Sequence, residues 1–265
     1  MTSWLALALA ASVAVAMDAP HNPELMDARL DLLDVGRLEL MLDVGYAGAL
    51  SCAQMRCMAS AAVGSVGAIV PRLWNANGTV DPAFMETYSN WADAGCDSGL
   101  ALQYALAFPC AGGTQDAVRQ AYNSSAAAQD ARLFGVFLAV LPNHETGCGW
   151  SRDDHWRNCN FVQNWVTVSP LLVSGIYTTR SAWTEIMGDE CSYIAEATPD
   201  IWYLDGDHVP SFHDWVPFGA WNTSDSTDLV FAKRYSSNAS VCNSTTNLNV
   251  QLPSHNDSNV NSTLP

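Results

Sequence analysis

The sequence contains little positive charge. One lysine, Lys233, and ten arginines stand against 27 acidic residues, so the formal net charge is −16. A surface of this charge repels phosphate backbones and anionic lipid headgroups, which makes nucleic acids and membrane surfaces poor partners. Acidity also keeps an exported protein soluble, and this plainer explanation of the charge stays open.

Long hydrophobic runs are also missing. The most apolar segment, residues 1–16, is too short to span a bilayer and ends in Ala14-Val15-Ala16, a small-residue pattern that signal peptidase accepts. We therefore predict a signal peptide at residues 1–16 and a secreted protein without a membrane anchor. Seven glycosylation acceptors agree with export: Asn77, Asn123, Asn222, Asn238, Asn243, Asn256 and Asn261.

No CxxC pair is present, which argues against zinc or thioredoxin chemistry, yet the chain has eight cysteines. An even number is what a disulfide framework in an oxidising compartment requires. Cys52 and Cys242 follow the first and last predicted strands, so a bridge between them would close a barrel. A bridge from Cys148 to Cys159 would fasten the loop between those two residues, although the sequence alone leaves the connectivity open.

The sequence also lacks a GxGxxG loop after a strand and a GxSxG elbow, which argues against a nucleotide-binding open sheet and a serine hydrolase. Short apolar runs alternate with helical patterns, a pattern typical of parallel strands joined by helices. We predict an α/β fold, a disulfide-bonded, TIM-like β/α barrel at residues 38–248. The expected strands are 38–44, 66–74, 100–108, 134–141, 173–178, 201–204 and 229–235, with an eighth near 218–221.

Local signals mark helices between these strands. Asp81 and Pro82 begin one helix, and Ser181 begins a shorter one that Gly188 ends. Residues 17–37 form a lead-in segment with helical spacing. Residues 249–265 are rich in Asn, Ser and Thr, so we predict a disordered tail there, because such a segment buries too little apolar surface to offset its ordering entropy.

In a β/α barrel, chemistry belongs at the carboxyl ends of the strands. Those ends combine aromatic rings with acidic groups, which suits a sugar, because rings stack on its apolar face and polar groups bind its hydroxyls. The predicted partner is therefore a carbohydrate. The residues expected to bind it are Trp74, Tyr104, Tyr177, Trp202, Tyr203 and Asp207.

The densest set of potential metal ligands is Asp205, Asp207, His208, His213 and Asp214. Hard oxygen ligands two residues apart, with imidazoles nearby, can hold a divalent ion. No second ligand set at metalloenzyme spacing accompanies them, so we predict no metal and no other cofactor.

Several segments, taken in order, resemble one known family. LDVG at 42–45, FPC at 108–110, GIYTT at 175–179 and IWYLDGDHVPSFHDWVPFGAW at 201–221 are similar to the lysozyme-like proteins of glycoside hydrolase family 25, especially the secreted branch of nematodes and amoebae. The resemblance implies a β/α barrel that cleaves the amino-sugar backbone of bacterial cell walls with carboxylates at its strand ends.

The resemblance also implies roles for single residues. Asp43 supplies the acid that ends the first strand, and Asp207 supplies the aspartate that follows Trp202-Tyr203. An Asp-x-Glu pair is implied at the end of the fourth strand, where GVFLAVLPNHE (135–145) has Val140 and Pro142 instead. A further acid near the last strand falls on Asn247.

Hydrolysis of a glycosidic bond usually needs one carboxyl to protonate the leaving oxygen and a second to support positive charge on the sugar. Valine and proline can do neither, so the leading hypothesis is a glycan-binding protein, directed at peptidoglycan or a chitin-like polymer, whose hydrolysis is lost or weakened. In a second reading, Glu145 folds back over the barrel and works with Asp43 as the catalytic acid of a muramidase. In a third, the barrel is a non-catalytic extracellular scaffold.

Overall fold

The computed structural model describes residues 39–45, 47–61, 66–112, 116–142, 149–168, 173–188, 191, 194, 200–222 and 229–251. The predicted signal peptide, the lead-in at 17–37, Glu145 and the tail after Gln251 lie outside these residues. A search of the described part finds no helix that is both long enough and apolar enough to cross a membrane.

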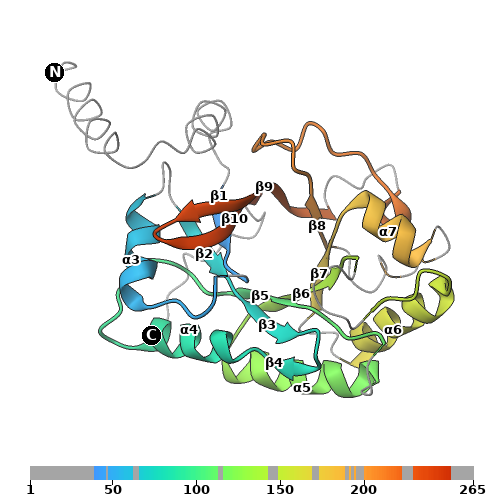
Figure 1. Cartoon of the computed structure of the whole chain (residues 1–265), viewed down its shortest axis with the longest axis horizontal. Helices are drawn as coiled ribbons and strands as arrows, with labels where there is room; N and C mark the ends of the chain where they lie inside the picture. Colours follow the sequence, from blue (N-terminus) through green and yellow to red (C-terminus); the bar gives the residue numbers. More distant parts are fainter. Residues whose placement is uncertain are drawn as a thin grey trace, which may run out of the picture.

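The described strands form one ten-stranded sheet that curls round a centre, with helices outside it (Figure 1). The strands are β1 (Glu39–Asp43), β2 (Val66–Val70), β3 (Arg72–Asn75), β4 (Thr79–Val80), β5 (Tyr104–Ala107), β6 (Gly135–Val140), β7 (Val173–Thr178), β8 (Asp200–Leu204), β9 (Val230–Val241) and β10 (Ser244–Gln251). The helices are α3 (Cys52–Ala61), α4 (Pro82–Ala92), α5 (Ala117–Asp130), α6 (His155–Val168), α7 (Arg180–Met187) and the 3-10 helix η2 (Gly219–Trp221).

The two ends of the sheet are joined by one bent strand. β2 and β3 are separated only by Pro71, which cannot donate a ladder hydrogen bond. β2 pairs with β1 at one end of the sheet and β3 pairs with β5 at the other end, so the bent strand connects the two ends. The ring is closed there by a parallel bridge between Ala68 and Ala101 and by a hydrogen bond of 2.9 Å from Leu106 N to Pro71 O.

The strand directions confirm the predicted α/β barrel and add one difference. All neighbouring pairs from β5 to β9 are parallel, as in a TIM-like fold, and β1 is parallel to β2. β10, however, is antiparallel to both of its neighbours, β9 and β1. The short β4 pairs with β3 and lies outside the ring.

Side chains alternate between two cores. One cluster fills the barrel, and its members are Met41, Ala68, Val70, Leu106, Phe137, Ala139, Tyr177, Trp202, Leu204 and Ala232. The other lies between the sheet and the helices. Inside the barrel the rings of Phe137 and Tyr177 both meet Trp202 edge-on, at 5.4 and 5.2 Å between centroids. The interior is therefore a packed core, as expected for a small barrel.

The helix signals were largely correct. The side chain of Asp81 accepts a hydrogen bond of 2.9 Å from the backbone at the start of α4, and Pro82 takes the first helical position. α7 ends at Gly188, whose positive φ of +65° favours glycine. Its N-cap is Thr179, however, and not Ser181, because the Thr179 hydroxyl accepts a hydrogen bond of 2.9 Å from Ala182 N.

The end of the sheet corrects the sequence prediction. The eighth strand is not at 218–221, where the chain forms η2; it is β10, which continues three residues past the expected barrel end at 248. The polar composition predicted disorder, but the strand can be buried because apolar and amide side chains alternate along it. Leu248 and Val250 face the outer core, while Asn247 and Asn249 face inward and form hydrogen bonds.

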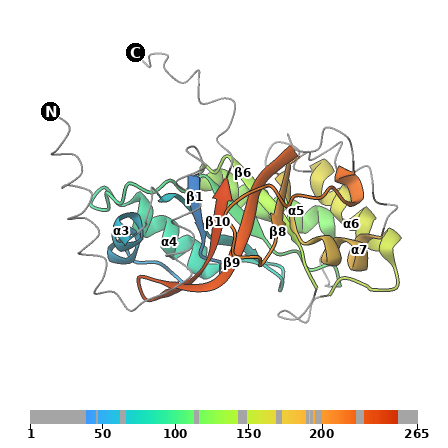
Figure 2. The same ribbon diagram turned by 90° about the horizontal axis from the view of Figure 1, so that it is seen from above.

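Three disulfides are described, and both pairings favoured from the sequence are wrong. The bonds join Cys52 to Cys96, Cys57 to Cys242 and Cys159 to Cys191. Cys52 and Cys57 are five residues apart on α3, so they point about 140° apart round the helix axis. Cys57 therefore faces the β9–β10 turn, which extends toward α3 (Figure 2).

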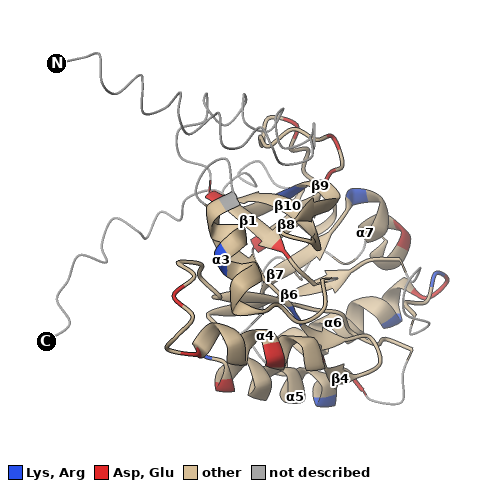
Figure 3. Ribbon diagram, turned by 60° about the vertical axis from the view of Figure 1, so that its left-hand side comes forward, with Lys and Arg blue, Asp and Glu red and all other residues tan. Residues whose placement is uncertain are grey.

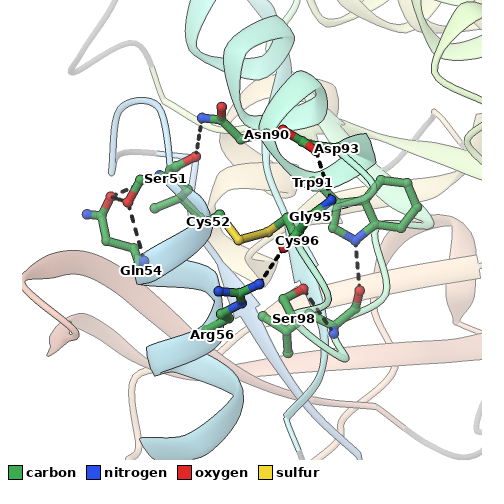
Figure 4. The surroundings of a disulfide bond; sticks show 12 residues. Ser51, Cys52, Gln54, Arg56, Asn90, Trp91, Asp93, Gly95, Cys96 and Ser98 are labelled. Atoms are coloured by element: carbon green, nitrogen blue, oxygen red, sulfur yellow. Dashed lines mark hydrogen bonds between the residues drawn. A yellow bond between two sulfur atoms is a disulfide. The ribbon is translucent and has the colours of Figure 1, made fainter.

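Cys52 faces the loop that follows α4 (Figure 4). Beside the bond from Cys52 to Cys96, Arg56 donates to the Gly95 carbonyl and the Trp91 indole donates to the Leu100 carbonyl at 2.8 Å. The disulfide and these hydrogen bonds together fix the loop against α3.

Candidate functional site

The carboxyl ends of β1, β3 and β5 to β8 meet at one end of the barrel, which we call the mouth. Asp43 ends β1, and Leu204, a member of the inner core, ends β8. Arg234 pairs with Leu204, and Asn247 pairs with Asp43. Because directly paired residues share a face of the sheet, Arg234 and Asn247 also point inward at the mouth.

Asp43 is the centre of a buried network. Its side chain has no exposed surface, and it accepts three hydrogen bonds. Gly45 N donates to Oδ1 at 2.9 Å, whereas Tyr177 OH and Asn247 Nδ2 donate to Oδ2 at 2.9 and 2.8 Å. Burying a carboxylate is costly unless donors surround it, and these three supply that compensation. The predicted residues Asp43 and Tyr177 are thus brought together, but neither is exposed.

The Asn247 amide is held in one orientation from both sides. Its Oδ1 accepts a hydrogen bond of 3.2 Å from Asn238 N, so its Nδ2 is the atom that faces Asp43. Asn238 lies where the β9–β10 register shifts, and its φ of +58° is typical of a bulge residue. The amide therefore serves as a donor at the position where the family resemblance implies a second acid.

Arg234 is the second charged residue that contacts the Tyr177 hydroxyl. Its Nη1 donates to the Tyr177 hydroxyl at 3.1 Å, and its guanidinium carbon lies 5.8 Å from the centroid of that ring. The hydroxyl accepts from Arg234 and donates to Asp43, so it separates the cation from the anion. The Arg234 side chain is only partly buried, in contrast to Asp43 and Tyr177.

β6 brings no acid to the mouth. Ala139 belongs to the inner core and holds the last inward position of the strand, whereas Val140 faces the outer core. Leu141 follows the strand and packs against both cores. Neither the strand nor Leu141 and Pro142 after it contains a carboxyl. Glu145 lies outside the described residues.

Two predicted stacking residues are fully packed. Trp74 belongs to the outer core, where its indole donates to Gln120 Oε1 at 3.3 Å. Trp202 fills the inside of the barrel and donates to Asn249 Oδ1 at 3.1 Å. Both side chains are at most 1% exposed, so other parts of the protein cover the ring faces on which a sugar would stack.

The two predicted tyrosines lie elsewhere. Tyr104 begins β5, so it is at the amino end of the barrel rather than at the mouth, and its ring packs against Phe231 at 5.0 Å. This corrects its expected place at a carboxyl end. Tyr203 belongs to the outer core and donates to Asp214 Oδ1 at 3.2 Å.

Asp207 forms part of an ion-pair cluster on the outer side of β9. Lys233 is fully buried, and its Nζ lies 2.7 Å from Oδ2 of both Asp207 and Asp214. Asp207 Oδ1 also accepts from Val209 N at 3.0 Å. These contacts give Asp207 a structural role in fixing the segment after β8, since a buried ammonium requires paired carboxylates.

Asp205 and Asp214 form a carboxyl pair within this cluster. Burial, the hydrogen bond to Asp214 and the charge of Asp207 raise the pKa of Asp205 above its usual value. Burial raises the pKa of Asp214 as well, but the hydrogen bond and charge of Lys233 outweigh it and lower the pKa overall. Asp205 is therefore the member that holds a proton more readily, and Asp214 is the charged acceptor.

The carboxylates of Asp205, Asp207 and Asp214 also have the donor atoms that a hard cation would use, within 4.8 Å of one another. Two of the three already bind the Lys233 ammonium.

Arg234 and Lys233 were missed from the sequence. Both belong to AKRY (232–235), in which Ala232 faces the inner core. Because successive side chains of a strand point to opposite faces, Arg234 faces the inside of the barrel and Lys233 faces the outside. The residues are adjacent in the sequence, so only the pairing of β9 with β8 reveals which one faces the mouth.

The comparisons with known proteins place the chain in a family. A family model described as "Lys-1: Lysozyme-like protein 1" matches residues 37–228. Lysozyme-like protein 5 of Caenorhabditis elegans is 27% identical over 157 residues, which is 58% of this chain and 68% of that protein. Probable GH family 25 lysozyme 2 of Dictyostelium discoideum is 41% identical over 49 residues, or 18% of this chain and 22% of that protein.

A solved structure shares the fold. The catalytic domain of the endolysin ply40, from bacteriophage P40 of Listeria monocytogenes, superposes with a TM-score of 0.53 at 15% sequence identity. The match covers 82% of this chain and 94% of that domain.

Proposed function

Because the chain belongs to the lysozyme-like family of glycoside hydrolase family 25, we propose that it binds amino-sugar glycans such as bacterial peptidoglycan, with hydrolysis lost or weakened. The matched relatives are named as lysozymes and lysozyme-like proteins, which supports an amino-sugar glycan as the ligand. The described disulfides support a secreted protein, because such bonds persist in oxidising compartments.

One observation carries the proposed loss of hydrolysis. Among the described residues that face inward at the mouth, Asp43 is the one carboxylate, and it is fully buried. Cleavage normally needs two carboxyl groups, one on each side of the glycosidic bond. Loss of a general acid alone costs about 10²- to 10⁴-fold in rate. β6 and the two residues that follow it, Leu141 and Pro142, contain no carboxyl that could donate a proton.

A working muramidase is the second candidate, and Asp205 favours it. This aspartate follows directly after β8 and is exposed. Partial burial, the hydrogen bond to Asp214 and the charge of Asp207 raise its pKa in the direction that a catalytic acid needs. Glu145 remains the other acid proposed for this role. Under this reading, one of these two carboxyls protonates the leaving oxygen.

Sedimentation and turnover on the same material separate these functions. The protein is mixed with insoluble peptidoglycan, and both the bound fraction and the reducing ends released are measured. Binding without release supports the proposal. Release that disappears in Glu145→Gln or in Asp205→Asn supports the second candidate and identifies its acid. If the protein neither binds the peptidoglycan nor releases reducing ends, both candidates are rejected and a scaffold role remains.

A further inference from the structure

The turn between β3 and β4 holds an exposed asparagine in a defined position. The two strands pair antiparallel, and Asn75 lies directly opposite Thr79. Gly78 adopts φ +83°, a conformation that favours glycine, and its backbone N–H donates to Asn75 O at 2.9 Å. Asn77 therefore lies in the tip of a tight turn, and the side chains of Asn77 and Thr79 are both exposed.

The Asn77 amide is oriented by Thr79. Thr79 N donates to Asn77 Oδ1 at 3.1 Å, and the Thr79 hydroxyl donates to the same oxygen at 2.7 Å. The first of these bonds defines an Asx turn, in which an asparagine side chain bonds the backbone two residues further on. Among the described residues, Asn77 Nδ2 has no hydrogen-bond partner. The oxygen of the amide is thus held against the chain, while its nitrogen is left for another group.

The surroundings of the turn have room for a large substituent. β3 runs toward the mouth, and β4 returns from it outside the ring of strands. β4 lies beside α5 at the outer edge of the molecule, as Figure 1 and Figure 3 both show. A group attached to Asn77 Nδ2 would therefore extend into solvent and displace neither core.

A second acceptor sequence has a different geometry. Asn123-Ser124-Ser125 lies within α5, and Asn123 is half-buried. Side chains two positions apart on a helix do not face each other, so the Ser125 hydroxyl is not directed at the Asn123 amide. An arrangement like that at Asn77 would require this part of α5 to leave the helical conformation.

We propose that Asn77 carries an N-linked oligosaccharide, and that the β3–β4 turn makes it a better acceptor than Asn123. Asn77-Gly78-Thr79 is an Asn-x-Thr sequence, which is glycosylated on surface segments of secreted proteins. The donor is an oligosaccharide linked to a lipid diphosphate. The bond from C1 of its first sugar to the diphosphate oxygen breaks, and the diphosphate keeps the electron pair. Asn77 Nδ2 forms a bond to that C1 and loses one proton.

The test measures the modified fraction at each site. The full chain is expressed in cultured insect cells and recovered from the medium. Peptide N-glycosidase in heavy-oxygen water converts each glycosylated asparagine into an aspartate that carries the heavy oxygen, and mass spectrometry of the peptides detects it. The label also distinguishes this aspartate from one formed earlier by spontaneous deamidation. Most of Asn77 should be labelled, and a much smaller fraction of Asn123.

Variants separate the turn from the acceptor sequence. Thr79→Ala removes the hydroxyl and should abolish the label at Asn77. Thr79→Ser keeps the hydroxyl, gives both sites a serine, and should still leave Asn77 more fully labelled than Asn123. Thr167→Ala is the matched control, because it changes an exposed threonine on α6 outside any acceptor sequence. It should leave the label at Asn77 unchanged.

Three results would overturn the inference. Asn77 could stay unlabelled in the secreted protein, or the chain could fail to leave the cells and carry no label at all. Equal labelling of Asn77 and Asn123, in the unaltered protein or in Thr79→Ser, would show that the turn does not favour Asn77. The inference goes beyond glycan binding, because here the protein accepts a sugar covalently. None of these results decides whether the protein binds peptidoglycan, so the proposed function is judged separately.

Discussion

The Nδ2 atom of Asn247 lies 2.8 Å from Oδ2 of Asp43 and donates a hydrogen bond to it. β1 and β10 bring the two residues together directly across an antiparallel pair. The Asn247 amide donates a hydrogen bond that an ionised carboxylate at this position could not donate. The mouth therefore holds one carboxylate with its hydrogen-bond donors instead of a pair of acids. The hydrogen bonds that Asp43 accepts stabilise its buried carboxylate.

Asn247→Asp tests that relationship. The change places two carboxyls within hydrogen-bond distance, where both cannot be ionised without repulsion. At pH 7 we expect the free energy of unfolding to fall by about 1–3 kcal/mol. Near pH 4 the loss should be smaller, because a protonated carboxyl donates as the amide does. Urea unfolding at both pH values measures this. Asn243→Asp, on the exposed β9–β10 turn, is the control and should change little.

Lys233→Met tests the ion-pair cluster. The substitution keeps the length of the side chain but leaves the carboxylates of Asp207 and Asp214 without their buried cation. We expect the free energy of unfolding to fall by about 3–5 kcal/mol at pH 7. Adding Asp207→Asn and Asp214→Asn to this variant should recover part of the loss. A triple variant no more stable than Lys233→Met would show that the lysine matters for packing alone.

Asp205→Asn tests the carboxyl pair through its pH dependence. The pKa of Asp205 is raised in the folded state, so its protonated form contributes stability below the usual value of 3.8, and this contribution is lost as pH rises through the folded pKa. An amide donates to Asp214 at every pH. The variant should therefore be more stable than the unaltered protein at pH 7, by less than about 1 kcal/mol because the site is exposed. The difference should vanish below pH 3.8; a difference that persists there contradicts the assignment.

The disulfides allow a comparison of loop lengths. Cys57 and Cys242 are 185 residues apart in the sequence, whereas Cys52 and Cys96 are 44 apart. Closing the longer loop restricts the unfolded chain more, so Cys57→Ser with Cys242→Ser should destabilise the protein by about 1 kcal/mol more than Cys52→Ser with Cys96→Ser. Denaturant unfolding of both double variants measures this. Equal losses would indicate that native contacts, and not loop entropy, set the effect.

The sequence predicted features that depend on neighbouring residues. The cap at Asp81, the end of α7 at Gly188 and the edges of β7 follow from local chemistry, and the structure confirms them. Strand pairing is not local, and so the sequence did not reveal that Val140, the position that the resemblance implies for an aspartate, faces the outer core while Ala139 faces the inner core. A shift of one residue exchanges the two faces of a strand.

The polar final strand shows the same limit. Asn249 was assigned to a disordered tail, and no strand was predicted at Asn247, because amide side chains are costly to bury alone. Their partners, Asp43, Met41 O and Trp202, lie far away in the sequence and become neighbours only when the barrel closes. The cysteine pairings depend on the same closure.

The most direct test of the account is the release of reducing ends from isolated peptidoglycan while most of the protein is bound to it. The account predicts a bound fraction well above that on uncharged cellulose and no release above the level of a protein-free sample. Rapid release by the unaltered protein, abolished by a single carboxyl-to-amide change at Glu145 or Asp205, would contradict it and show that the barrel is a working hydrolase.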